Sequence, residues 1–406
     1  MDISVLPILS LIIFSPIVGI ALAAIFRDEG NGIPAKVSAL FSSGISFLLS
    51  LHLWFNFDSS TADLQMVERI PWITQFNIEY FLGLDGLNLF FFLIITFITP
   101  LALLGSWNVA KRNWQFQIQM LLLQIGMLGC FAAMDVVLFY VFFEVMLVPM
   151  YLLIGIWGGP NRLYATIKFF IYTMLGSLLM LISLLYTANI YLDLNGAWSF
   201  SVLDWYGMQI PPETQFWLFL GFAAAFAVKI PLFPLHTWLP DAHYEAPTAG
   251  SVQLAAVMLK FGPYGFLRFA MPIFPAAVFD LTPIFMVLAL IGIIYGGLVA
   301  MVQPQIKRLI AYSSVAHMGY IVLGLFALNI QGLSGSWIQM INHAIVTGAL
   351  FLTVGMIYER THTQEISAYG GVAHTMPKFA VFLVFFSMAS VGLPGLNGFV
   401  GEVLTM

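Results

Sequence analysis

The chain has 406 residues, of which 61% are hydrophobic and only 8% charged, and its formal net charge is −5. This composition is typical of an integral membrane protein and leaves no room for a soluble domain. The small, dispersed charge provides no surface for nucleic acid. The single cysteine, Cys130, excludes a disulfide framework or a cysteine metal cluster within the chain.

Long apolar runs follow one another along the whole chain. A membrane-spanning helix needs about 20 predominantly apolar residues, and the sequence predicts an all-α polytopic protein with about 12 such helices. The first run, Ser4–Phe26, is long enough to span and lacks a cleavage site, so we interpret it as a retained helix. The expected spans are 4–26, 34–56, 84–106, 116–134, 136–157, 164–192, 215–239, 249–271, 281–303, 306–328, 336–358 and 376–406.

The lysines and arginines between these spans predict the orientation. If the N-terminus faces outside, ten basic residues lie inside or at the inner boundary, and only Arg69 and Arg268 lie outside. Inner loops of membrane proteins carry the excess of Lys and Arg. We therefore expect an outside N-terminus, and the two longest connections, 57–83 and 193–214, then also face outside.

Two expected spans are interrupted by proline and glycine. The seventh contains Pro231 and Pro234, and the twelfth contains Pro394 and Gly395. Paired interrupted helices indicate inverted repeats around a midplane transport site, and a separation of five spans predicts inverted five-helix repeats. We expect spans 1–3 in residues 1–110, the first repeat (spans 4–8) in 111–275, and a second repeat (spans 9–12), cut short, in 276–406.

Three charged residues lie deep inside apolar runs: Glu144, Lys229 and Lys260. Each such charge costs roughly 2.5–3.5 kcal/mol at the bilayer centre, so charges retained there usually belong to ion paths or proton relays. One acid and two bases favour proton transfer. The alternatives are a structural Glu144–Lys229 ion pair and, for Lys260, a side chain that extends to the interface.

Histidines and a carboxylate near the second interruption extend this pattern. His317 and His343 lie in neighbouring spans, and histidine titrates near neutrality. They suit a proton relay, although a structural role or a haem with two histidine ligands remains an alternative. Glu402 follows the Gly-rich break within the twelfth span, and we expect it to be the counterpart of Lys229 and to end the relay.

Several polar residues surround the first interruption. Four polar residues follow the broken span: His236, Asp241, His243 and Glu245. They predict a site of proton uptake on the inner face. The alternative is that they are ordinary loop and helix-capping residues. Lys168 lies just inside its helix and either joins that site or extends to the interface. Lys307 and Arg308 are expected to anchor the tenth span at the inner boundary.

The residues around these charges resemble a known family. Residues 228–265 read VKIPLFPLHTWLPDAHYEAPTAGSVQLAAVMLKFGPYG, and FFEVMLVPMYLL, KRLIAYSSVAHMGY, NHAIVTGALF and LPGLNGFVGE occur elsewhere in the chain. From about Leu84 to its last residue the chain resembles the antiporter-like membrane subunits of respiratory complex I. Within that family it is most similar to the subunit M group (mitochondrial subunit 4), because the sister subunits usually carry lysine at the position of Glu402.

The resemblance implies a function and its residues. Glu144 and Lys229 would form the Glu–Lys pair, Lys260 would be the central lysine, His317 and His343 would connect, and Glu402 would end a hydrated polar axis. The subunit would translocate protons without a cofactor of its own. NADH, FMN, iron–sulfur clusters and quinone would be bound by partner subunits, and two sister antiporter-like subunits would be neighbours. Subunit M chains have about fourteen spans, so we expect this chain to be truncated.

Three other readings stay open at the level of sequence. A D-type subunit of a multisubunit sodium/proton antiporter, or a subunit of a membrane-bound hydrogenase, would share the fold and the Glu–Lys pair. A membrane haem enzyme would use His317 and His343, and a solitary metabolite transporter would need a polar substrate-sized cluster, which the sequence lacks. For the proposed subunit, a bacterial plasma membrane is favoured over the mitochondrial inner membrane.

Overall fold

The computed structural model describes residues 7–27 and 32–406. Their packing divides the chain into two units, each described by itself. The first unit comprises Met1–Leu153, Thr173–Ala225 and Tyr264–Ala277, and the second comprises Ile154–Tyr172, Phe226–Pro263 and Val278–Met406. The first expected span, 4–26, begins outside the described residues, and its described part is helical.

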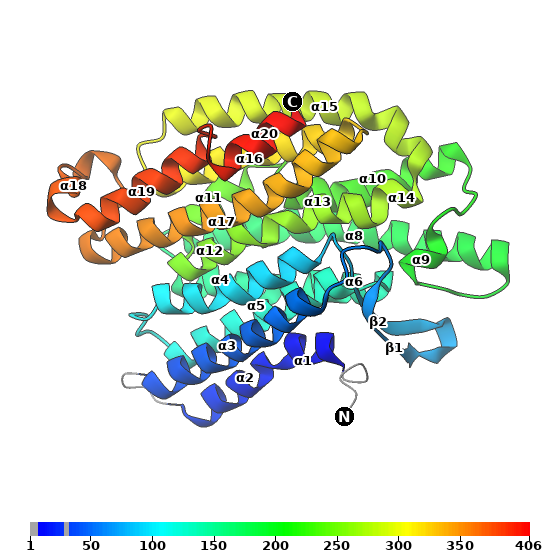
Figure 1. Cartoon of the computed structure of the whole chain (residues 1–406), viewed down its shortest axis with the longest axis horizontal. Coiled ribbons are helices and arrows are strands. Elements are labelled where there is room, and N and C mark those ends of the chain that lie inside the picture. The colour runs from blue at the N-terminus through cyan, green and yellow to red at the C-terminus, as the bar shows by residue number, and fades with distance from the viewer. Residues whose placement is uncertain (1–6, 28–31) are drawn as a thin grey trace. The chain divides into compact units, whose positions relative to one another are not determined.

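The first unit contains helices, with one hairpin between the third and fourth (Figure 1). Its core includes Phe91 stacked on Phe131 at 4.5 Å between ring centroids, with Tyr264 edge-on to Phe131 at 4.8 Å. Such aromatic pairs bury large apolar areas. The helices are α1 (Ile8–Phe14), α2 (Pro16–Ile25), α3 (Ile33–Asn56), α4 (Leu89–Gly105), α5 (Asn113–Ala132), α6 (Val136–Val145), α9 (Val202–Trp205), the π-helical η4 (Phe266–Ala270) and α14 (Met271–Ile273).

The hairpin occupies the 57–83 connection, to which the sequence analysis assigned no secondary structure. Strands β1 (Gln65–Ile73) and β2 (Ile78–Leu84) pair antiparallel, joined by the 3-10 turn η2 (Thr74–Phe76). Pro71 within β1 weakens the sequence signal, because proline cannot donate to a strand ladder. An ion pair of 2.6 Å between Arg69 and Glu79 joins the two strands.

The second unit is built around α17, which packs against α12, α16, α19 and α20 (Figure 1). Helices α16 and α17 approach closely, since a Cβ on Gly324 would lie 2.6 Å from the Gly332 carbonyl oxygen. The elements are α11 (Trp238–Glu245), α12 (Thr248–Ala256), η3 (Met258–Lys260), α16 (Ile306–Phe326), α17 (Ile330–Thr361), η5 (Ile366–Ala368), α18 (Val372–Thr375), α19 (Pro377–Ser390) and α20 (Asn397–Thr405).

Five helices extend across the boundaries that divide the units. They are α7 (Leu147–Trp157), α8 (Arg162–Asn195), α10 (Pro212–Lys229), α13 (Phe261–Gly265) and α15 (Pro275–Met301).

Within the described residues, eight helices are long and apolar enough to cross a membrane. The other four expected spans coincide with helices that are short, interrupted or more polar at one end. They are α4, α10 followed by α11, the segment from α12 to η4, and α19 followed by α20. The polytopic helical class is thus confirmed, while the count of twelve spans and the inverted repeats stay predictions.

Candidate proton-transfer site

Lys260 lies where the helix that begins at Thr248 breaks. Helix α12 ends at Ala256, and a 3-10 turn, η3, carries the chain to Lys260. The last carbonyls of a helix lack helical partners, and the Lys260 ammonium group donates a hydrogen bond to one of them, the Ala255 oxygen. The Lys260 side chain is fully buried, and its Nζ lies 2.7 Å from Nδ1 of His343.

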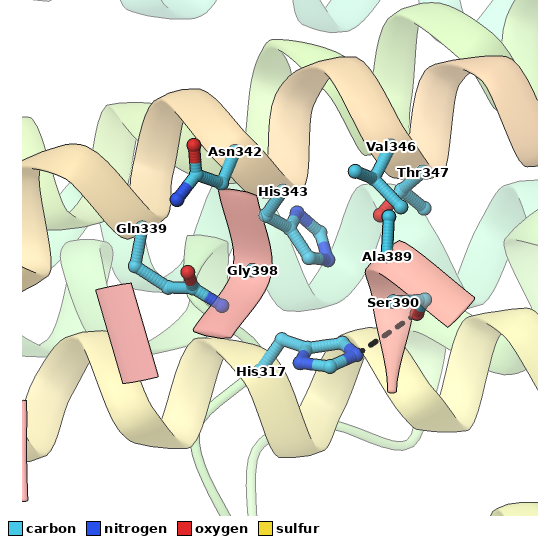
Figure 2. Close-up of a pocket in the computed structure, with 9 residues that line it drawn as sticks. All are labelled: His317, Gln339, Asn342, His343, Val346, Thr347, Ala389, Ser390 and Gly398. Carbon is cyan, nitrogen blue, oxygen red and sulfur yellow. Dashed lines mark hydrogen bonds between the residues drawn. The ribbon is translucent and has the colours of Figure 1, made fainter. Parts of the chain in front are cut away.

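Two histidines continue from Lys260. His343 on α17 is buried, and its ring centroid lies 5.7 Å from that of His317 on α16. Nδ1 of His317 lies 2.7 Å from Oε1 of Glu402, and Nε2 lies 3.2 Å from the Ser390 hydroxyl, the contact drawn in Figure 2. Lys260, His343, His317 and Glu402 therefore follow one another in a row, which we call the polar row.

The break between α19 and α20 brings Glu402 to this row. Gly395 there has a φ of +94°, a left-handed conformation that glycine adopts without a steric penalty. The Asn342 amide donates to the backbone oxygen of Asn397, the first residue of α20, at 2.7 Å, which links α17 to the start of α20. The Gln339 amide donates to Glu402 Oε1 at 3.2 Å. Both amides come from α17, one turn apart, beside His343 (Figure 2).

A small cavity lies against the two histidines. Its volume is about 10 Å³, and it is lined by polar groups of α16, α17 and α19, as Figure 2 shows. A cavity needs about 10–15 Å³ of this kind to hold one water. Nε2 of His343 is buried and has no hydrogen-bond partner among the described residues. The cavity therefore has room for about one water beside the two imidazole rings.

Lys229 ends α10 at the other break. It is buried, and its ammonium nitrogen lies 5.9 Å from the Phe169 ring centroid. The carbonyl of its neighbour Val228, freed by the break, accepts a hydrogen bond of 3.0 Å from the Trp238 indole. Glu144, in α6, hydrogen-bonds to Tyr140. Glu144 and Lys229 belong to different units, so their pairing stays a prediction.

The residues expected at the site of proton uptake lie on or just before α11 and at the start of α8. Asp241 and Glu245 line the same cavity, whose volume is about 230 Å³. Asp241 is engaged by Lys168 at 2.8 Å and by Arg308 at 3.3 Å. His236 is buried and stacks on Phe233, whereas His243 is fully buried against Phe351.

The basic and acidic residues nearby also have separate partners. Glu245 accepts the backbone N–H of Asn161 at 3.0 Å. Lys307, expected as a boundary anchor, is buried, and its Nζ donates to the Ala246 oxygen at 2.8 Å. An anchor would be solvated, so the burial of Lys307 calls for a different role.

Sequence reasoning missed two sets of polar residues. The first set supports the polar row and consists of Gln339, Asn342 and Ser390. Two of these residues are amides that lie close to His343 in an apolar stretch of sequence, and this pattern could have indicated their role. In the first unit, Arg268 had been counted only for orientation. It is buried, and Nη2 lies 2.6 and 2.7 Å from the two carboxylate oxygens of Asp85. No local signal marks a pair separated by 183 residues.

The fold and the polar row define a polytopic helical membrane protein with titratable side chains buried at helix breaks, the class to which ion-translocating subunits belong. A family-wide sequence pattern described as NADH:quinone oxidoreductase/Mrp antiporter, TM matches residues 133–406. The chain belongs to this family.

Individual relatives agree with this membership. NADH-quinone oxidoreductase subunit M of Rhodobacter capsulatus is 47% identical over 98% of this chain and 80% of its own length. NADH-ubiquinone oxidoreductase chain 4 of Arabidopsis thaliana is 43% identical over 98% of this chain and 79% of its own length. Among solved structures, a chain of respiratory complex I from Thermus thermophilus with bound NADH superposes with a TM-score of 0.87 at 35% identity, covering 97% of this chain and 81% of that one.

Proposed function

We propose that the chain is the proton-translocating subunit M of an NADH–quinone oxidoreductase. The observation that carries this function is the polar row, in which Lys260, His343, His317 and Glu402 lie within hydrogen-bond distance or ring contact of one another. Lysine, histidine and glutamate are side chains that can exchange protons, whereas arginine keeps its proton. A buried row of such groups is costly unless it is used.

The residues of the row have distinct roles. Lys260 holds a proton at Nζ between the Ala255 carbonyl and His343. The two imidazoles pass a proton between lysine and carboxylate, with a water in the small cavity as a bridge. Glu402 accepts the proton and is held by the Gln339 amide. Because breaks in α12 and in the α19–α20 segment expose backbone polar groups, both ends of the row stay in a polar interior.

The energy for this transfer comes from outside the chain. Moving one charge against a membrane potential costs about 2.3 kcal/mol per 100 mV. Electron transfer from NADH to quinone in partner subunits, which carry the FMN and iron–sulfur clusters, supplies it. Glu144 and Lys229 form the Glu–Lys pair whose changing charge state couples the row to a sister subunit. The N-terminus faces outside in a bacterial plasma membrane.

A vesicle assay tests this function. In membranes that oxidise NADH, we expect Lys260→Met and Glu402→Ala each to lose most proton pumping while the complex stays assembled. Lys378→Met is the matched control, because Lys378 is exposed and lies outside the row. Normal pumping by assembled Lys260→Met would overturn the relay. Sodium-driven exchange without NADH oxidation would instead identify the antiporter subunit.

A further inference from the structure

The side-chain amide of Gln339 has a hydrogen-bond partner at one end only. Gln339 lies on α17 and is 2% exposed. Its Nε2 donates to Oε1 of Glu402 at 3.2 Å, whereas its own Oε1 is buried and has no hydrogen-bond partner among the described residues. Buried polar atoms rarely stay without a partner, because this is destabilising. Gln339 therefore carries an acceptor beside Glu402 that its observed contact does not use.

Asn342, one turn further along α17, is held differently. Its Nδ2 donates to the Asn397 backbone oxygen at 2.7 Å, and its Oδ1 accepts from the Asn397 amide at 3.3 Å. Turning this amide over would break two hydrogen bonds at once. Figure 2 draws both amides on α17 beside His343. The Asn342 amide is thus fixed in one orientation, whereas the Gln339 amide is held at one end.

Two features give the Gln339 amide room to turn over. Helix α20 packs on α17 at Gly401, where a Cβ would lie 2.2 Å from Gln339 Oε1, so a side chain there would displace the amide. Gln339 also lines the small cavity of about 10 Å³, which has room for about one water. A water there is the available partner for the amide atom that does not contact Glu402.

Glu402 Oε1 is shared between the Gln339 amide and His317, whose Nδ1 lies 2.7 Å away. An ionised carboxylate can only accept, so both neighbours then donate to it. Once Oε1 has taken a proton, of these two neighbours only Nδ1 can accept the new O–H, which favours return of the proton. The further titratable groups nearby are Tyr320 of α16, within electrostatic reach of Glu402, and His343 of α17, beside His317.

We propose that Gln339 is a positioning residue whose amide turns over when Glu402 is protonated. This rests on the proposed function. The N–H bond at Nδ1 of His317 breaks, and an O–H bond forms at Oε1 of Glu402. The amide then presents its oxygen, which accepts this O–H in competition with Nδ1 and stabilises the proton on the carboxyl. When Glu402 ionises again, the amide returns to donating through Nε2.

Infrared difference spectroscopy of the assembled complex tests the turn without relying on transport. After a step to acidic pH, the C=O band of protonated Glu402 is the one that Glu402→Gln lacks. We expect this band to shift to higher frequency in Gln339→Met, because the carboxyl loses its acceptor, and to keep its frequency in Asn342→Leu. With ¹³C in the glutamine side chains, one amide carbonyl band should move to lower frequency on the same step, except in Gln339→Met.

NADH-driven pumping provides the second readout. Gln339→Met should slow it about tenfold, the effect of losing one hydrogen bond to a charged group. Gln303→Met is the matched control, because the Gln303 amide donates to the Val299 carbonyl outside the polar row, and it should pump normally. Gln339→Asn, whose amide is one methylene shorter, replaces the methionine variant if that variant does not assemble.

The outcomes separate this inference from the proposed function. An unchanged Glu402 band in Gln339→Met, or glutamine carbonyl bands that do not respond to the pH step, would show that the amide does not turn. The same band shift in Asn342→Leu would assign the effect to the packing of α17. If Lys260→Met fails to pump in either case, the proposed function stands and this inference is wrong. If Lys260→Met pumps normally, the relay is wrong, and Gln339 has no part in transport.

Discussion

The first unit buries an arginine–carboxylate pair, whereas the second buries a row of lysine, histidine and glutamate. Arg268 contacts both oxygens of Asp85, and its Nε lies 3.2 Å from the Tyr264 hydroxyl. The Tyr206 hydroxyl donates to the Arg268 carbonyl at 2.7 Å. Arginine keeps its proton at all accessible pH values, so this group is a fixed lock between a strand end and a π-helical turn.

The polar row differs from this lock in composition and in packing. None of its members is an arginine, and a cavity adjoins its histidines. One carboxylate oxygen in the row serves two partners, since Glu402 Oε1 contacts both His317 and Gln339. The contrast teaches that burial of charge alone does not mark a transport site. The row proposed for transport differs in that its groups belong to residue types that exchange protons and in that a cavity adjoins them.

The largest expected effect comes from turning a titratable group into a fixed charge. Lys229→Arg keeps the positive charge but cannot release its proton, so we expect pumping to be nearly abolished. Proton uptake per NADH oxidised, in vesicles with confirmed assembly, is the measurement. Glu144→Ala should show the same loss, because it removes the predicted partner of Lys229. Retained pumping in Lys229→Arg would mean that this position behaves like Arg268, and the contrast would fail there.

Breaking the lock should affect stability and not the pumping of assembled protein. Arg268→Met leaves the Asp85 carboxylate buried without its partner, which costs about 3–5 kcal/mol. We expect a lower midpoint of thermal unfolding and less assembled complex, with normal pumping per assembled complex. The double variant Arg268→Met/Asp85→Leu should recover most of the stability. Pumping lost in a fully stable double variant would show that the lock takes part in transport.

Asp135, which precedes α6 in the first unit, offers a pH test. It accepts backbone N–H groups of Glu79, Val137 and Leu138, yet burial raises the pKa of its carboxyl to about 6. The folded protein then binds this proton more tightly than the unfolded chain does, so stability falls as pH rises from about 4 to about 6.

Asp135→Asn should remove this contribution, roughly 2–3 kcal/mol. The measurement is the unfolding midpoint of both proteins across that pH range. We expect the wild-type midpoint to fall relative to that of the variant as pH rises. A constant difference between the two would contradict the raised pKa.

The smallest effect is expected at the edge of the polar row. Ser390→Ala removes the hydroxyl 3.2 Å from His317 Nε2, a contact worth about 0.5–1.5 kcal/mol. We expect a slightly lower unfolding midpoint and a modest decrease in pumping rate, because His317 still contacts Glu402. Ser313→Ala is the control, because Ser313 lies on α16 and its hydroxyl donates to the Ile310 carbonyl of the same helix. A complete loss of pumping in Ser390→Ala would make the serine itself part of the relay.

The sequence alone was sufficient for the class of protein and for the residues worth testing. A membrane-spanning helix is a local property, because its length and apolar composition are set within one segment. The cost of charge in hydrocarbon is also local, so Glu144, Lys229, Lys260 and Glu402 stood out without any partner being known. The positions of the two breaks followed from proline and glycine chemistry in the same way.

Only the tertiary structure decided which of these groups meet. Lys260 lies next to His343, and His317 next to Glu402, because α16, α17 and α20 pack together, which no segment specifies by itself. The burial of Lys307 and His243 was likewise decided by the tertiary structure. Their environment is built by segments far apart in the chain, so a lysine expected at a solvated boundary lies instead against a cavity.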